Sequence, residues 1–98
     1  MTKPNSFNID LKSCERFTEI LKGLANPMRL CLVKTLIEFG VLNVSELQNI
    51  LGFPQSTTST QLMRLRQHNI VNRERKGTEI YYRVDNPTVI KIIKTLEL

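Results

Sequence analysis

The chain has no tryptophan, one histidine and only two cysteines. A single histidine excludes most Ser-His and Cys-His nucleophile pairs, and the sequence contains no glycine-rich phosphate loop. We therefore expect no catalytic residues and no enzymatic activity. Borderline and soft metal ions favour histidine and cysteine ligands, so we also expect no metal site and no other cofactor.

Long hydrophobic runs are missing as well. No apolar stretch approaches the ~20 residues that span a bilayer, and the N-terminal sequence MTKPNSFNID lacks the hydrophobic segment of a signal peptide. Cys14 and Cys31 have neither CxxC nor secretory spacing, which favours a reducing compartment. These absences predict a cytoplasmic protein without a membrane partner.

Acidic residues are scarce in one part of the chain. The net charge is +5 over 98 residues, and 41% of the residues are hydrophobic, which suffices for one domain with a thin core. Residues 1–54 hold six Lys/Arg and five acids, whereas residues 55–83 hold six Lys/Arg and two acids. This imbalance favours a polyanionic partner for the second part, although a solvated surface is a simpler explanation.

Apolar residues at helical spacing dominate the first two thirds of the chain. Residues 10–25 predict an amphipathic helix, and Asn26-Pro27 supplies an N-cap and a first-turn proline for a second helix that ends at Gly40. A short third helix begins at a capping-box pattern and ends at a glycine, and a fourth follows at about 55–68. Two short helices joined by so tight a turn are typical of a helix-turn-helix.

After residue 69 the apolar period changes from helical to two. It predicts strands near 71–75 and 79–84 around a turn at 76–78, and Asn86-Pro87 then starts a last helix. The order α-α-α-α-β-β-α predicts a mainly α (α+β) winged helix-turn-helix that forms one domain over 1–98. Its expected parts are a flexible arm (1–9), two dimerisation helices (10–25 and 87–98), the helix-turn-helix (43–69) and the wing (70–84).

Five successive hydroxyl residues, Ser56 to Thr60, open the fourth helix despite their poor helix propensity. The leucine spacing turns Thr58, Leu62 and Leu65 inward and leaves an outward face that is small and polar, then basic, without any acid. In a helix-turn-helix this end enters the major groove. A Ser/Thr-rich cap is the alternative, but we favour a DNA-contacting set of Gln55, Ser56, Thr57, Ser59, Thr60 and Arg64.

The predicted wing has a basic tip. Four polar or basic residues flank the tight turn at Gly77, and such residues suit phosphate or minor-groove contacts beside the major groove. Charged residues also deter edge-to-edge strand pairing, which is the alternative explanation. The predicted wing contacts are Arg73, Arg75, Lys76 and Thr78.

Three stretches resemble the ArsR/SmtB family of bacterial winged-helix repressors over residues 20–84: LKGLANPMRLCLVKTL, NVSELQNILGFPQSTTSTQLMRLRQHNIV and RKGTEIYYRV. The resemblance is strongest to a metal-independent subgroup. It implies a homodimer that binds a palindromic operator near its own promoter, at the bacterial nucleoid, with contacts at Gln55, Ser56, Ser59 and Thr60. It also places the dimer interface on the terminal helices, where the apolar candidates are Leu11, Phe17, Val89, Ile92, Ile93 and Leu96.

The sequence departs from the family pattern at several positions. Pro54 replaces the usual serine, which removes a side-chain cap from the fourth helix, and Thr60-Gln61 replaces a more basic pair. Asn43 and Ser45 stand where one family metal site has cysteines, and Asn86 and Thr88 stand where the other has Asp and His ligands. These replacements predict an altered operator preference and no metal response.

Two alternatives remain for the function. A thiol-responsive repressor would use Cys14 and Cys31, but both fall on apolar faces, where free cysteine usually acts as a small hydrophobic residue. A winged-helix protein-interaction module would explain the fold and a dimer, but not the acid-free face of the fourth helix. DNA binding therefore explains the sequence best.

Overall fold

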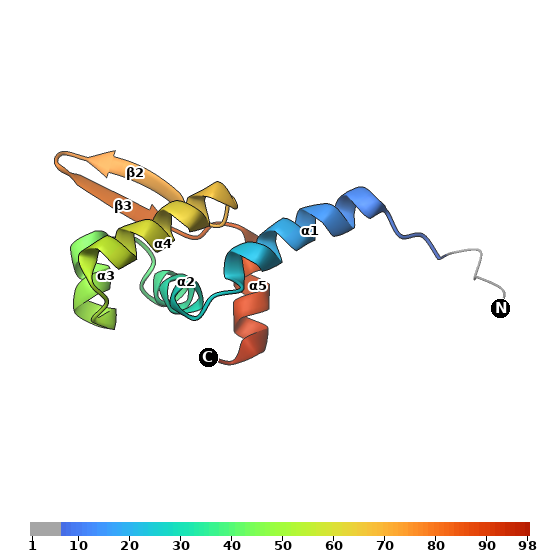
Figure 1. Ribbon diagram of the computed structural model, residues 1–98, viewed down its shortest axis with the longest axis horizontal. Coiled ribbons are helices and arrows are strands. Elements are labelled where there is room, and N and C mark those ends of the chain that lie inside the picture. The colour runs from blue at the N-terminus through green and yellow to red at the C-terminus, as the bar shows by residue number, and fades with distance from the viewer. Residues whose placement is uncertain (1–6) are drawn as a thin grey trace.

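The computed structural model describes residues 7–98, which form five helices and three strands (Figure 1). In chain order these are α1 (Leu11–Leu24), α2 (Pro27–Phe39), β1 (Leu42–Asn43), α3 (Val44–Leu51), α4 (Gln55–Gln67), β2 (Asn72–Lys76), β3 (Glu79–Arg83) and α5 (Pro87–Leu96). The winged helix-turn-helix is confirmed. Most of the predicted arm over 1–9 lies outside the described residues.

Side-chain caps start three helices where the sequence predicts them. The Asn26 side chain accepts hydrogen bonds from the N–H groups of Met28 and Arg29 at 2.9 and 3.1 Å, directly before the proline that opens α2. At α3, Asn43 and Glu46 form the complete capping box, with bonds of 2.8 and 3.0 Å. The Asn86 side chain caps α5 in the same way as Asn26 caps α2. Each cap satisfies N–H groups that the helix itself leaves free.

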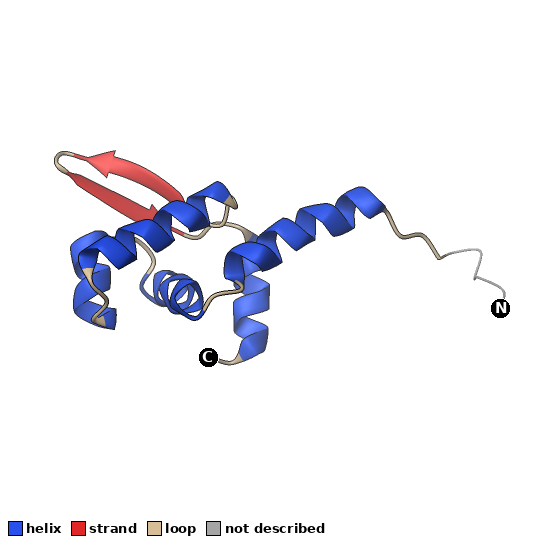
Figure 2. Ribbon diagram, in the orientation of Figure 1, coloured by secondary structure: helices blue, strands red, loops and turns tan. Residues whose placement is uncertain are grey.

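One strand was not predicted. β1 pairs antiparallel with β3, with Leu42 opposite Tyr82 and Asn43 opposite Tyr81, so the sheet order is β1-β3-β2. Figure 2 shows the other two strands, β2 and β3, as the long hairpin of the wing. A two-residue strand has no periodicity that a sequence could reveal, and only its distant partner defines it. This pairing joins the base of the wing to the segment between α2 and α3.

The core lies between α2 and the helices and strands around it. Leu32, Val33 and Leu36 of α2 are buried, as are Leu62 and Leu65 of α4. The inward direction predicted for α4 is therefore confirmed, and Thr58 joins its leucines with 1% of its surface exposed. This packing decides which face of α4 remains outside.

The interface prediction is wrong for Val89 and Ile93. Both side chains belong to the core of the single chain, with exposed fractions of 0% and 1%, so they have no surface left to bury against a partner. Helical spacing identified the apolar stripe of α5 correctly but not what covers it. Its other members differ, because Ile92 is half-buried and Leu96 remains 50% exposed.

Helix α1 touches the rest of the chain mainly through its last two turns. Its first turns extend away from the body (Figure 1), and its buried residues are Ile20, Gly23 and Leu24. Gly23 lies against the end of α4: a Cβ atom there would collide with the side chain of Ile70 and lie 2.8 Å from the Cβ of His68. The glycine thus allows α1 and α4 to approach closely.

We predict that Gly23→Ala lowers the free energy of unfolding by about 1 kcal/mol. Overpacking costs roughly 1–3 kcal/mol, and the gain of about 1 kcal/mol in helix propensity offsets only part of it. Urea denaturation measures the difference. Thr18→Ala, at an exposed position of the same helix, is the control and should cause no loss; equal stability of the two variants would contradict the close approach.

Candidate nucleic-acid interface

The outward face of α4 carries most of the predicted DNA-contacting residues. Ser56, Thr60 and Arg64 are four residues apart and exposed, on the side of the helix opposite the buried Thr58 and Leu62. Gln55 and Ser59 are exposed as well, whereas Thr57 is half-buried. The structure thus brings five of the six candidates to the surface of one helix and partly covers the sixth.

The first turn of α4 has no side-chain cap. Pro54 is the N-cap residue and forms no side-chain hydrogen bond to the helix. Its carbonyl accepts instead from the N–H and the hydroxyl of Thr58, at 2.9 and 3.0 Å. The N–H groups of the first turn remain without partners inside the helix. Together with the positive end of the helix dipole, they suit a phosphate group.

Arg29 holds α4 in place, a role that the sequence did not reveal. From α2 its guanidinium donates to the side chain of Gln61 at 2.9 Å and to the Gly23 carbonyl at 2.7 Å, with a longer contact of 3.4 Å to the Lys22 carbonyl. One side chain therefore joins the end of α1 to the middle of α4. The contact spans 32 residues of sequence, so no local pattern could have indicated it.

The strand register divides the predicted wing residues between two faces. Arg73 lies opposite Tyr82 and Arg75 opposite Ile80, so both arginines share the face from which Tyr82 enters the core. Lys76 belongs to the other face, where its Nζ lies 5.8 Å from the centre of the Tyr81 ring. All residues of β2 and Thr78 are exposed. Arg73 and Arg75 can thus act together, and Lys76 cannot join them on the same face.

Arg83, at the base of the wing, forms ion pairs with two acidic residues. Its Nε donates to Asp85 at 2.7 Å, and Glu74 lies 3.7 Å from its Nη1. Hydrogen bonds from Asn72 and Arg83 lower the pKa of Asp85 below its ordinary value, so the carboxylate that receives them stays charged. These contacts fix the strand ends where the wing joins α5.

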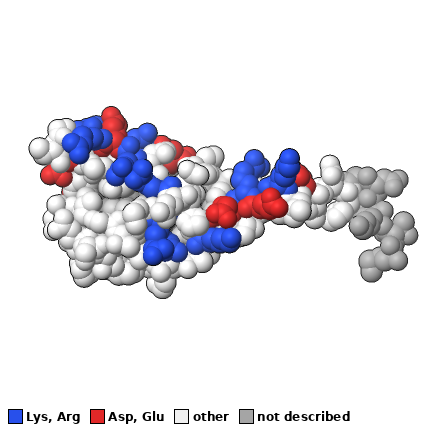
Figure 3. Space-filling model, turned by 45° about the horizontal axis from the view of Figure 1, so that its top comes forward, with Lys and Arg blue, Asp and Glu red and all other residues white. Residues whose placement is uncertain are grey.

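Several basic residues near α4 and in β2 have no acidic partner within 4 Å among residues 7–98; they are Arg64, Arg66, Arg73, Arg75 and Lys76. Figure 3 shows basic side chains over the part of the molecule that carries the wing and along α1, with acidic ones among them in both places. The free cations are therefore defined by their lack of partners rather than by a purely basic surface.

Cys14 and Cys31 are both free and exposed in the single chain. Neither therefore acts as a small hydrophobic residue in its core. The described part of the chain contains no group of three His, Cys, Asp or Glu side chains arranged to hold a metal ion. Its helices are also too short or too polar to cross a membrane.

Known proteins resemble this chain in sequence and in fold. The family model for bacterial regulatory proteins of the arsR family matches residues 26–73. The chain is 44% identical to the transcriptional repressor PagR of Bacillus anthracis over 88 residues. These residues cover 90% of this chain and 88% of that protein. The crystal structure of that repressor superposes with a TM-score of 0.83 over 89% of this chain and 99% of that chain.

Two further relatives extend the likeness. The biofilm growth-associated repressor of Xylella fastidiosa is 35% identical over 96 residues, which cover 97% of this chain and 83% of that protein. The structure of HlyU from Vibrio cholerae has a TM-score of 0.82 at 29% identity, over 88% of this chain and 92% of that chain. The resemblance found in the sequence is thereby confirmed.

We predict that Arg29→Met lowers the free energy of unfolding by about 2–3 kcal/mol. Methionine keeps the unbranched stem but removes the charged donors. One hydrogen bond to a charged group contributes roughly 1.5–3 kcal/mol, and the loss stays near that of one bond because the acceptors are only partly buried and regain bonds to water. Lys34→Met makes a similar change on the same helix but breaks only a surface pair with Glu38, so it should cost less than about 1 kcal/mol. Equal losses in urea denaturation would contradict the role given to Arg29.

Proposed function

The chain belongs to the arsR family of bacterial regulatory proteins, and on that premise we propose that it is a repressor that binds operator DNA through α4. The observation that carries the proposal is the first turn of this helix. After Gln55 its side chains are short, its N–H groups lack a side-chain cap, and no acidic residue follows before Glu74. Such an end can approach a duplex closely without repelling its phosphates.

The proposed contacts divide by chemistry. Gln55, Ser56, Ser59 and Thr60 offer amides and hydroxyls to base edges in the major groove, where the first turns of a recognition helix lie. Thr57 is half-buried and contributes chiefly its backbone N–H. Arg64 lies further along the outward face of α4. Arg73 and Arg75 of the wing would contact the adjacent sugar-phosphate backbone of the DNA, where cations displace condensed counterions.

We further propose that two copies bind together. Large apolar side chains remain exposed on both terminal helices: Leu11 is 71% exposed, Leu21 54%, Phe17 41% and Leu96 50%. A groove of about 480 Å³ lies between α1 and α5, lined by Phe17, Ile92 and Leu96 among others. An uncovered apolar face of this extent favours a second copy.

A symmetric dimer implies a symmetric operator. It would present two copies of α4 to half-sites roughly 34–36 Å apart, or a multiple of that spacing, and so read a palindrome. The operator proposed for this chain lies near the promoter of the protein's own gene. The protein would therefore act in the cytoplasm, at the nucleoid. Repression then follows from occupying DNA that the polymerase needs.

We predict that Ser56→Glu weakens operator binding by a factor of one hundred or more while the midpoint of thermal unfolding stays unchanged. A carboxylate in the first turn of a helix favours the helix dipole, so folding does not suffer, but the same carboxylate repels DNA phosphates. Fluorescence anisotropy with the duplex upstream of the protein's own gene measures the affinity.

Gln67→Glu is the matched control, because it adds the same charge at the other end of the same helix, where the side chain is also exposed. It should weaken binding far less than Ser56→Glu. If both variants lose affinity equally, overall charge and not the first turn of α4 governs binding.

We predict that Leu96→Glu converts a dimer into monomers in sedimentation equilibrium. Leu96 is half-exposed in the single chain, so a charged replacement leaves the core intact but cannot be buried against a second copy. Ile50→Glu is the control on α3, where the exposed fraction is 44%, and it should remain dimeric. A dimer that survives Leu96→Glu would place the interface elsewhere.

A further inference from the structure

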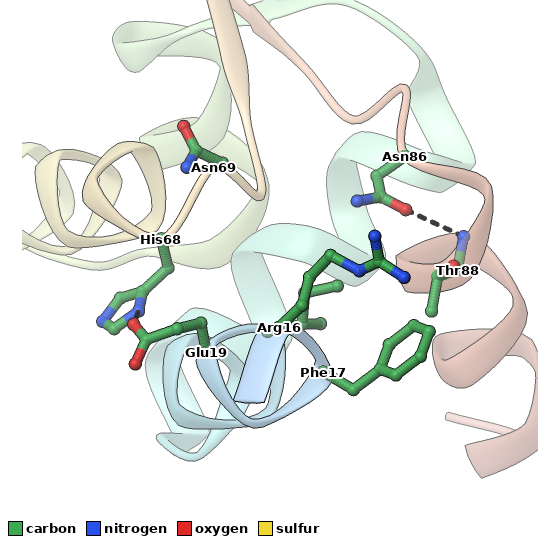
Figure 4. A pocket seen from close by; sticks show the side chains of 8 residues that line it. Arg16, Phe17, Glu19, His68, Asn69, Asn86 and Thr88 are labelled. Atoms are coloured by element: carbon green, nitrogen blue, oxygen red, sulfur yellow. Dashed lines mark hydrogen bonds and ion pairs between the residues drawn. The ribbon is translucent and has the colours of Figure 1, made fainter. Parts of the chain in front are cut away.

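A second cavity, polar on one side, lies where α1, the end of α4 and the start of α5 meet (Figure 4). Its volume is about 470 Å³, within the range of roughly 300–1,000 Å³ that small-molecule sites occupy. Neither the proposed DNA contacts nor the exposed apolar faces of the terminal helices account for its polar lining.

Three donors converge at one end of this cavity. In Figure 4 the guanidinium of Arg16 extends from α1 toward Asn86 and Thr88 at the start of α5. The Asn86 side-chain oxygen already accepts the N–H groups that it caps, so its NH₂ group is the part left to donate. The hydroxyl of Thr88 adds a third donor.

Arg16 has no counter-charge in the described part of the chain. No carboxylate lies within 4 Å of it in residues 7–98. The nearest acid on the cavity wall is Glu19, whose carboxylate lies 3.3 Å from both Lys22 Nζ and His68 Nδ1. Figure 4 shows Glu19 and His68 turned toward each other, away from the guanidinium. The end of the cavity at Arg16 is therefore electropositive.

Apolar surface completes the cavity. The Phe17 ring lies beneath the guanidinium, with its centre 5.3 Å from the central carbon of Arg16, and Ile20 is buried beside it. At the opposite wall, the Nδ1 atom of His68 is buried and lacks a hydrogen bond of proper geometry despite its short distance to Glu19.

We propose that this cavity binds a small organic anion, a carboxylate with a short apolar body. Arg16, Asn86 and Thr88 bind the carboxylate, because a guanidinium and neutral donors together match its oxygens. Phe17 and Ile20 contact the apolar body. A free phosphate shares the anionic chemistry but has no group to place on the ring.

The position of the cavity also suggests what the anion does, and this part rests on the proposed function. Phe17 and Thr88 line both the cavity and the groove proposed for the second copy. His68, on the other wall, is the C-cap residue of α4. An anion here would contact both terminal helices and α4, and would thus change operator affinity by altering how the two copies of α4 are held.

The test is a titration of the full ¹⁵N-labelled chain, without DNA, with potassium benzoate and separately with potassium phosphate. Potassium chloride at equal ionic strength is the reference. Benzoate should cause saturable shifts in the amide signals of Arg16, Asn69, Asn86 and Thr88, with phosphate at least tenfold weaker. Arg16→Gln should lower the affinity for benzoate at least tenfold. Lys12→Gln, which removes the same charge from an exposed position of α1, should leave that affinity unchanged.

Any of three titration results would overturn the site: no saturable shift with benzoate, equal losses in Arg16→Gln and Lys12→Gln, or phosphate binding as tightly as benzoate. Dissociation of Arg16→Gln into monomers without any anion would also overturn it, because Arg16 would then bind an acid of the second copy.

Operator affinity measured with saturating benzoate should change at least threefold; no change would overturn the regulatory role. Anion binding is measured without DNA, so its failure and that of the proposed function are distinguishable.

Discussion

Burial of one face of α4 against α2 determines how the rest of the molecule presents itself. Leu62 and Leu65 are completely buried. Thr58 is buried with them, and its hydroxyl is satisfied by a hydrogen bond to the Pro54 carbonyl. Because a helix has only one such face, the opposite residues must point outward. The hydroxyl run then becomes understandable, since small side chains cost helix propensity but leave the first turn narrow and its N–H groups accessible.

The other contacts keep this helix in a fixed position. Arg29 joins it to the end of α1, Gly23 allows α1 to approach it closely, and β1 ties the wing to the segment before α3. The helix proposed to read DNA is thus connected to the helices proposed to form the dimer. A ligand or a partner that moves α1 would change the position of α4 through these contacts. This coupling is the basis of the role proposed for the cavity at Arg16.

Local patterns in the sequence predicted the features that depend on local physics. Caps at Asn26, Asn43 and Asn86 and the inward direction of Leu62 follow from short-range rules, and the structure confirms them. The errors concern tertiary contacts. Periodicity shows that an apolar stripe is covered but not by what, so Val89 and Ile93 were assigned to an interface and belong to the core.

The central claim is that free cations beside an acid-free helix bind a polyanion, and salt dependence tests it most directly. Arg64, Arg73 and Arg75 supply three unpaired cations in each copy, hence six in a dimer. Each neutralised phosphate contributes about −0.9 to the slope of log K against log salt concentration, so a slope of about −5 is expected for duplex DNA. A slope near zero would contradict DNA binding and favour a protein-interaction module.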